Sequence, residues 1–212
     1  MYHKLKRDYN KFYAEGGWWH DHDRERAFLD DRIIAPLGLK GGAKLLDLCC
    51  GMGHFSALFH DAGFDVTGLD RSEVGITHAR ENYPGPTFLN ADADEVFERF
   101  APESLDVIFV RGMSWYHYEL NETNKHDVDV ASKTARLFEL LVPGGHFILQ
   151  IKTDFSGNRP ETGVYHLKVG EFRRHFEAFG EIRLLTDWDG VPLANDGDGE
   201  QSGRNVIIAT RK

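Results

Sequence analysis

The stretch LLDLCCGMGHFS (Leu45–Ser56), followed by VTGLD (Val66–Asp70), decides the fold that we predict for this chain. An apolar run that carries one acid, Asp47, leads into a glycine-rich turn, and a second apolar run ends in another acid, Asp70. In an open α/β sheet such strands end at one edge, where a turn and carboxylates surround a nucleotide-like ligand. The pattern therefore predicts a ligand with ribose hydroxyls and, beside Asp47, a positive charge.

Strand and helix patterns alternate along the chain after this stretch. Helices are expected at 24–35, where Pro36 ends the helix, and at 55–62, 73–82, 94–100, 130–141 and 172–179. Strands are expected at 44–49, 64–70, 87–90, 105–111, 145–152, 182–186 and 205–210. The last two have no helix between them and should pair antiparallel. The fold class is therefore an α/β layered sheet with one reversed strand.

Composition limits the classes of function. At 212 residues the chain is long enough for one domain with a substantial core, and its formal net charge of -9 argues against a nonspecific nucleic-acid binder. The only cysteines, Cys49 and Cys50, are adjacent within an apolar run, which indicates a reducing compartment. Neither a secretory signal nor an apolar run of membrane-spanning length is found, so we expect a cytoplasmic protein without a membrane partner.

The first forty residues precede the predicted sheet, so we divide the chain into an arm, 1–40, and a domain, 41–212. The arm is rich in aromatic residues, namely Tyr9, Phe12, Tyr13, Trp18 and Trp19. These side chains either pack across the edge of the sheet or form a lid over the ligand pocket.

The residue types of the turn fit a nucleoside-binding site. Gly51 and Gly53 can adopt positive φ and allow the backbone to approach a ligand closely. Asp70 can accept hydrogen bonds from both ribose hydroxyls, and Asp92, after the third strand, can reach an adenine amino group. An NAD-dependent reductase is the competing interpretation. It is disfavoured because Ser56 replaces the third glycine of its fingerprint and an acid within the first strand would repel a diphosphate.

With these residues, 42–211 resembles the class I S-adenosylmethionine-dependent methyltransferases of the small-molecule type. The resemblance implies a Rossmann-like sheet of order 3-2-1-4-5-7-6, with strand 7 antiparallel, helices on both faces and S-adenosylmethionine as cofactor. It implies that Asp70 binds ribose and that Asp92 and Ala93 contact adenine. The cofactor-binding residues carried over are Asp47, Cys49, Gly51, Gly53, Asp70, Arg71, Asp92, Ala93, Arg111 and Tyr13. Cys49 stands where the family usually has its first glycine, and Arg111 where a small or apolar residue is common.

The predicted reaction is methylation of an oxygen or nitrogen atom of a small molecule. The acceptor would be recognised by segments 113–126, 153–168 and 187–204, and His117 is the candidate general base because imidazole titrates near neutrality. A protein that binds the cofactor without catalysis, as a partner or sensor, is the alternative. Nucleic-acid base methylation is disfavoured because Arg111-Gly112-Met113-Ser114 stands where an Asn/Asp-Pro-Pro-Tyr motif is expected.

Two groups of residues could suggest a metal. His20 and His22 alternate with Asp21 and Asp23, a spacing that is common on solvated loops. The acidic pairs Asp187/Asp189 and Asp196/Asp198 lack the terminal Glu of a calcium loop. We therefore expect no metal centre in either group.

Overall fold

The computed structural model describes residues 8–118, 129–152, 168–195 and 204–212. These residues contain a seven-stranded sheet of order β3-β2-β1-β4-β5-β7-β6, which confirms the predicted order. Only β7 runs antiparallel to its neighbours, β5 and β6, as predicted. The strands are β1 (Lys44–Leu48), β2 (Asp65–Asp70), β3 (Thr87–Asn90), β4 (Leu105–Arg111), β5 (Leu141–Lys152), β6 (Gly180–Asp187) and β7 (Arg204–Arg211).

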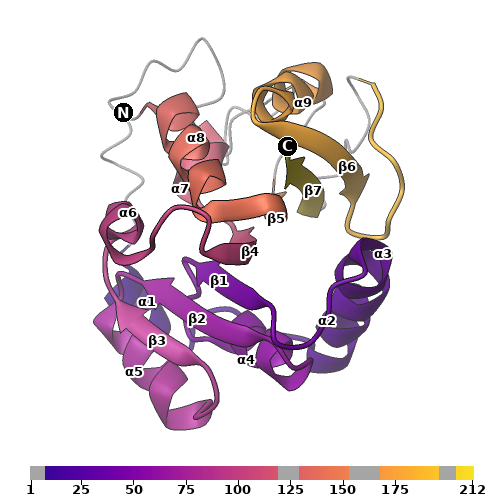
Figure 1. The fold of residues 1–212 in the computed structure, drawn as a ribbon. Coiled ribbons are helices and arrows are strands. Elements are labelled where there is room, and N and C mark those ends of the chain that lie inside the picture. The colour runs from indigo at the N-terminus through magenta and orange to yellow at the C-terminus, as the bar shows by residue number, and fades with distance from the viewer. Residues whose placement is uncertain (1–7, 119–128, 153–167, 196–203) are drawn as a thin grey trace.

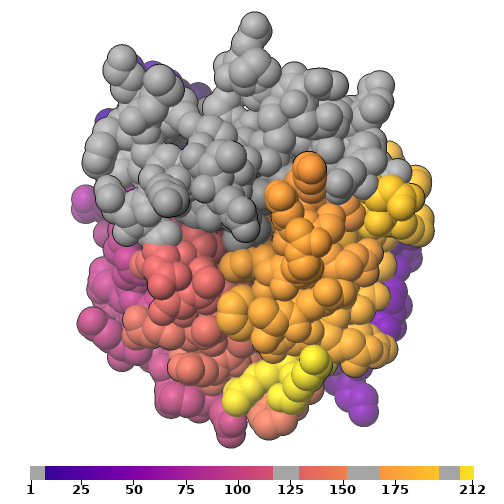
Figure 2. Space-filling view, turned by 90° about the horizontal axis from the view of Figure 1, so that it is seen from above, coloured from indigo at the N-terminus to yellow at the C-terminus, as the bar shows by residue number. Residues whose placement is uncertain are grey.

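Helices cover both faces of this sheet (Figure 1). On one face lie α6 (Val96–Arg99), α7 (Ser114–Tyr118), α8 (Val130–Leu140) and α9 (Val169–Glu177). On the other lie α2 (His22–Leu29), η2 (Asp30–Ile34), α4 (His54–Asp61) and α5 (Glu73–Asn82). The remaining short helices are α1 (Tyr9–Ala14), α3 (Ala35–Leu37) and η3 (Ala93–Glu95). From above, the surfaces of α8 and α9 adjoin each other (Figure 2).

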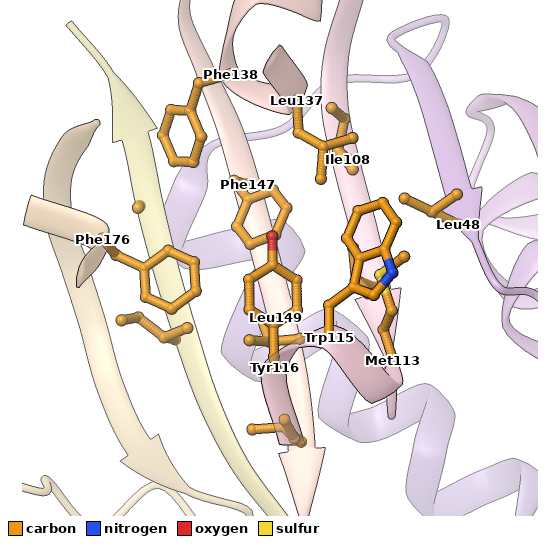
Figure 3. Packing of buried hydrophobic residues seen from close by; sticks show 14 of the residues in the cluster. Leu48, Ile108, Met113, Trp115, Tyr116, Leu137, Phe138, Phe147, Leu149 and Phe176 are labelled. Atoms are coloured by element: carbon orange, nitrogen blue, oxygen red, sulfur yellow. The ribbon is translucent and has the colours of Figure 1, made fainter. Parts of the chain in front are cut away.

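Buried clusters on both faces hold the layers together. Under α8 and α9, Phe147 of β5 packs against Tyr116, Phe138 and Phe176, with ring centroids 5.4–5.9 Å apart (Figure 3). On the opposite face, Phe109 of β4 packs between rings of α4. Because both faces are covered, the central strands read as nearly continuous apolar runs in the sequence.

The helix predicted at 24–35 differs from the observed structure. It starts at His22, passes through the π-helical η2 and ends at Leu37, so the prediction that Pro36 ends it is wrong. Pro36 lies in the first turn of α3, where proline is tolerated. Gly38, with φ of 61°, ends the helix instead.

The strand predicted at 145–152 begins earlier, at Leu141, because α8 ends at Leu140. Leu141 pairs with Leu105 before a register shift brings His146 opposite Val107. The short helix predicted at 94–100 is split into η3 and α6. Among the described residues, no helix is long and apolar enough to cross a membrane.

Candidate functional site

The turn after β1 adopts the conformation that its glycines predict. Gly51 and Gly53 have φ values of 59° and 83°. Cys49, in place of the family's first glycine, also has a positive φ of 67°, which is uncommon for a residue with a Cβ. A Cβ on Gly53 would lie 2.7 Å from Ala79 Cβ. The turn is therefore fixed both by its backbone conformation and by its packing.

Asp70 binds the tip of β2 to this turn. Its Oδ2 accepts a hydrogen bond from the Gly51 N–H at 2.9 Å, and its Oδ1 accepts one from the Ser72 N–H at 2.8 Å. Burial raises the pKa of Asp70, although these backbone hydrogen bonds oppose the rise. The predicted ribose-binding acid and the predicted glycine turn thus form one unit, and carboxylate oxygens with further lone pairs remain for a ligand.

Asp47 lies deeper, with 1% of its surface exposed. It accepts a hydrogen bond of 2.6 Å from the Ser56 hydroxyl. Burial raises the pKa of its carboxyl to about 7, an effect that the Ser56 hydrogen bond partly offsets. Near neutral pH this acid is poised between its two states, so a nearby cation would favour the charged one.

The arm reaches this site through Tyr13 and Asn10. Tyr13 is buried, and its Oη lies 2.7 Å from the position of a Cβ on Gly51. The side-chain oxygen of Asn10 accepts hydrogen bonds from the Ser72 hydroxyl at 2.7 Å and from the Val74 N–H at 3.3 Å. The arm therefore packs on the turn and on the start of α5.

The residues predicted near adenine lie beside other partners. Asp92 follows β3 by two residues, is exposed and forms a reciprocal cap on η3 with Glu95. Ala93 begins η3 and is half-buried. The Arg71 guanidinium lies 5.3 Å from the centroid of the Tyr9 ring.

Arg111, at the end of β4, is part of a polar cluster that the sequence analysis missed. One guanidinium nitrogen lies 3.3 Å from Oε1 of Glu25, and the guanidinium carbon lies 4.6 Å above the Phe55 ring. His20 and His54 lie on the other carboxylate oxygen, 2.9 and 2.8 Å from Oε2. Although burial acts in the opposite direction, the histidines and Arg111 lower the pKa of Glu25, while burial lowers the pKa of His20. No local pattern marks this cluster, because its members come from three separate segments.

Gln150 was also missed. It is opposite Arg111 in the register of β4 and β5, and only 1% of its surface is exposed. Neither polar atom of its side-chain amide has a hydrogen-bond partner within the described part of the chain. Such an amide costs about 1–3 kcal/mol per unsatisfied group, so it suggests a ligand contact.

Some of the predicted residues are not described by the structure. The side chain of His117 lies outside the described residues, as do segments 119–128, 153–167 and 196–203, which include Asp196 and Asp198.

His20 and His22 do not act as a pair. Asp21, between them, caps α2, and His22 lies beside Asp23 in an exposed position. Asp187 caps a turn by accepting a hydrogen bond from the Val191 N–H.

The raised pKa of Asp47 has a consequence for stability. Between pH about 4 and 7 the unfolded chain loses this proton and the folded chain keeps it, so the free energy of unfolding should fall as pH rises. Asp47→Asn should remove this fall, on the order of a few kcal/mol, in urea unfolding at pH 5 and 7.5. The exposed Asp65→Asn is the control and should keep the wild-type slope. If the unfolding free energies of wild type and Asp47→Asn changed equally with pH, the raised pKa of Asp47 would be contradicted.

Comparison with known proteins agrees with this geometry. The methyltransferase domain family matches residues 45–145. A malonyl-[acyl-carrier protein] O-methyltransferase of Pectobacterium atrosepticum is 35% identical over 66 residues, which are 31% of this chain and 26% of that protein. An S-adenosyl-L-methionine-dependent Diels-Alderase of Neonectria sp. is 23% identical over 182 residues, 85% of this chain and 64% of that protein. The chain thus spans between 26% and 64% of the length of these two relatives.

A solved structure shows the same fold over nearly the full length. Magnesium protoporphyrin IX methyltransferase from Synechocystis PCC 6803, with bound SAH, superposes with a TM-score of 0.67 at 17% identity and covers 99% of this chain and 100% of that one. The sheet order, the glycine turn with its acids and the match over residues 45–145 agree with one another: this part of the chain is similar to the methyltransferase domain family, and the chain resembles the class I S-adenosylmethionine-dependent methyltransferases.

Proposed function

We propose that this chain transfers the methyl group of S-adenosylmethionine to an oxygen or nitrogen atom of a small molecule. The observation that supports this most is the joining of Asp70 to the Gly51 N–H, because it brings a carboxylate and an open backbone turn to one strand edge. When bound, the cofactor supplies an electrophilic methyl group, so the protein has to align the acceptor and exclude water.

The residues present fit such a cofactor. Asp70 would hold the ribose. At Gly51 and Gly53 the backbone of the turn would approach the ligand without Cβ clashes. Asp47, buried and with a pKa near 7, would favour the cationic end of the ligand once ionised. Asp92, Ala93, Arg71 and Cys49 remain proposed contacts on the basis of the family motif. We further propose that arm residues 1–40 cover the cofactor, which the packing of Tyr13 on Gly51 supports.

For the acceptor we propose a small molecule that carries a hydroxyl, carboxyl or amine group. The Pectobacterium relative is named an O-methyltransferase, which supports oxygen. Gln150 offers a buried amide that both donates and accepts hydrogen bonds, so it is a proposed acceptor contact. His117 remains the proposed general base for an acceptor that must lose a proton. The two free cysteines support a reducing, cytoplasmic location.

A second candidate is binding of S-adenosylmethionine without methyl transfer. The Neonectria relative is named an S-adenosyl-L-methionine-dependent Diels-Alderase and not a methyltransferase, which supports this candidate. Asp70 and the turn would serve either function in the same way. The two candidates differ only in the fate of the methyl group.

Transfer of a labelled methyl group separates these candidates. The full chain is incubated with S-adenosylmethionine carrying a labelled methyl group and a panel of hydroxy acids, dicarboxylates, quinols and amines. We expect labelled product from at least one class, and its loss in Asp70→Ala. Cofactor binding without labelled product from any class would favour the second candidate, and the absence of cofactor binding would contradict both.

A further inference from the structure

Three potential metal ligands converge beside Arg111. They are His20 Nδ1, His54 Nε2 and the carboxylate of Glu25, and all of these atoms lie within 4.8 Å of one another. His20 comes from the arm, Glu25 from α2, and His54 from the first position of α4. The side chains are 21%, 6% and 12% exposed, so the group is largely shielded from bulk water.

His54 and His20 lie against the same carboxylate oxygen of Glu25. The Nε2 of His54 lies 2.8 Å from Oε2 of Glu25, yet this buried nitrogen has no hydrogen bond of acceptable geometry within the described residues. His20 Nδ1 lies 2.9 Å from the same oxygen, and the two imidazole rings stack with centroids 4.1 Å apart. One nitrogen of each imidazole ring therefore lies close to the same oxygen, Oε2 of Glu25.

The two nitrogen–oxygen separations can be compared with those between the ligands of a metal ion. Adjacent ligands of an octahedral ion with bonds of about 2.1 Å are about 3 Å apart, whereas those of a tetrahedral ion are about 3.4 Å apart. The observed distances of 2.8 and 2.9 Å agree with the octahedral case. Two histidines and one carboxylate on one face of an ion leave its other positions open for water or an oxygen-bearing ligand.

Arg111 is the main electrostatic objection, since its guanidinium lies in the cluster. Its Nη2 contacts Oε1 of Glu25 at 3.3 Å, and its Nη1 lies 3.4 Å from His20 Nδ1. The shorter of these contacts is to the oxygen that does not meet His54. A carboxylate that ligates an ion through one oxygen and accepts a hydrogen bond through the other is a common arrangement around protein-bound metals.

A cavity of about 420 Å³ borders the cluster on the side of His54, and His22, Ala57, Leu58 and the 83–86 loop also line it. His20 and Glu25 do not line this cavity, and the Nε2 of His54 is buried, so the three ligand atoms are shielded from it.

We propose that His20, Glu25 and His54 bind one divalent transition-metal ion of the Fe²⁺, Co²⁺ or Ni²⁺ class. These borderline ions accept imidazole nitrogen and carboxylate oxygen and adopt octahedral geometry with open positions. His54 directly follows Gly53, and His20 and Glu25 lie in the arm that we propose covers the cofactor, so the ion would lie next to the proposed cofactor site. None of the three ligands is a proposed cofactor contact itself, so ion binding can be measured without S-adenosylmethionine.

The test uses the full chain, stripped of metal with a chelator and desalted, in the absence of S-adenosylmethionine. Titration with Co²⁺, followed by calorimetry and by visible absorption, should give one bound ion with the weak bands of an octahedral complex. His20→Ala, His54→Ala and Glu25→Gln should each weaken binding by about 100-fold. Circular dichroism establishes which variants are folded, and His54→Ala decides the matter if Glu25→Gln does not fold.

His22→Ala and His60→Ala are the matched controls. His22 is a neighbouring histidine of the arm, with its ring 6.0 Å from that of His54, and His60 lines the same cavity as His54. Both variants should bind Co²⁺ within about twofold of wild type. The proposal is overturned if wild type binds no stoichiometric ion, or if His54→Ala binds Co²⁺ as tightly as wild type. Cofactor binding by the wild-type chain is measured separately, so failure of the ion to bind and failure of the proposed methyl transfer are distinguishable.

Discussion

Asp70→Ala should weaken binding of S-adenosylmethionine by at least about 100-fold, because two ribose hydroxyls would lose a charged acceptor. The same substitution removes the acceptor of the Gly51 and Ser72 N–H groups, so the turn itself should loosen. Binding is measured by calorimetry with the demethylated product and with the cofactor. Both ligands carry the ribose, so both should weaken equally.

Two further variants separate the contributions of Asp70. Asp70→Asn keeps an oxygen acceptor for one backbone N–H but loses the charge, and it should bind almost as poorly as Asp70→Ala. Asp65→Ala, at the exposed start of the same strand, should bind like wild type. A dissociation constant for Asp70→Ala within about twofold of wild type would contradict the role of this acid in ribose binding.

Gly53→Ala should lower the free energy of unfolding by more than the cost of a left-handed backbone alone. The new Cβ would lie 2.7 Å from Ala79 Cβ and 2.8 Å from Phe88 Cζ, in a residue with φ of 83°. Left-handed backbone alone costs about 1–2 kcal/mol. Overpacking against these two side chains should add about 1–3 kcal/mol.

Gly42→Ala is the matched control for this prediction. Gly42 has nearly the same φ, 84°, but a Cβ there would meet nothing within 4 Å. Urea unfolding should therefore show a clearly larger loss of unfolding free energy for Gly53→Ala than for Gly42→Ala. Equal losses in the two variants would mean that contact with α5 and β3 does not constrain the turn.

The sequence predicted the parts of the molecule that have local signatures. Gly51 and Gly53 indicated a left-handed turn, and apolar runs ending near Asp70 indicated parallel strands whose tips meet. The strand order came from the resemblance of these motifs to a family. In each case the residue type itself carries the physical requirement, either freedom in φ or burial on both faces.

The parts that could not be predicted depend on tertiary contact. Nothing in the local pattern indicates that His20 turns away from His22 and meets Glu25 and His54. The π-helical turn of η2 also has no local signature, so Pro36 was expected to end a helix that in fact continues to Leu37. Cys49 stands where the family usually has a glycine. Its residue type does not indicate a positive φ, which only the folded turn imposes.

The most direct test of the central claim is a calorimetric titration of S-adenosylmethionine into the full chain, repeated in the presence of NADH. We expect one-to-one binding that NADH does not displace, because Asp47 favours a cation and would repel a diphosphate. Absence of heat on titration, or NADH binding that Asp70→Ala abolishes, would contradict binding of S-adenosylmethionine at this site.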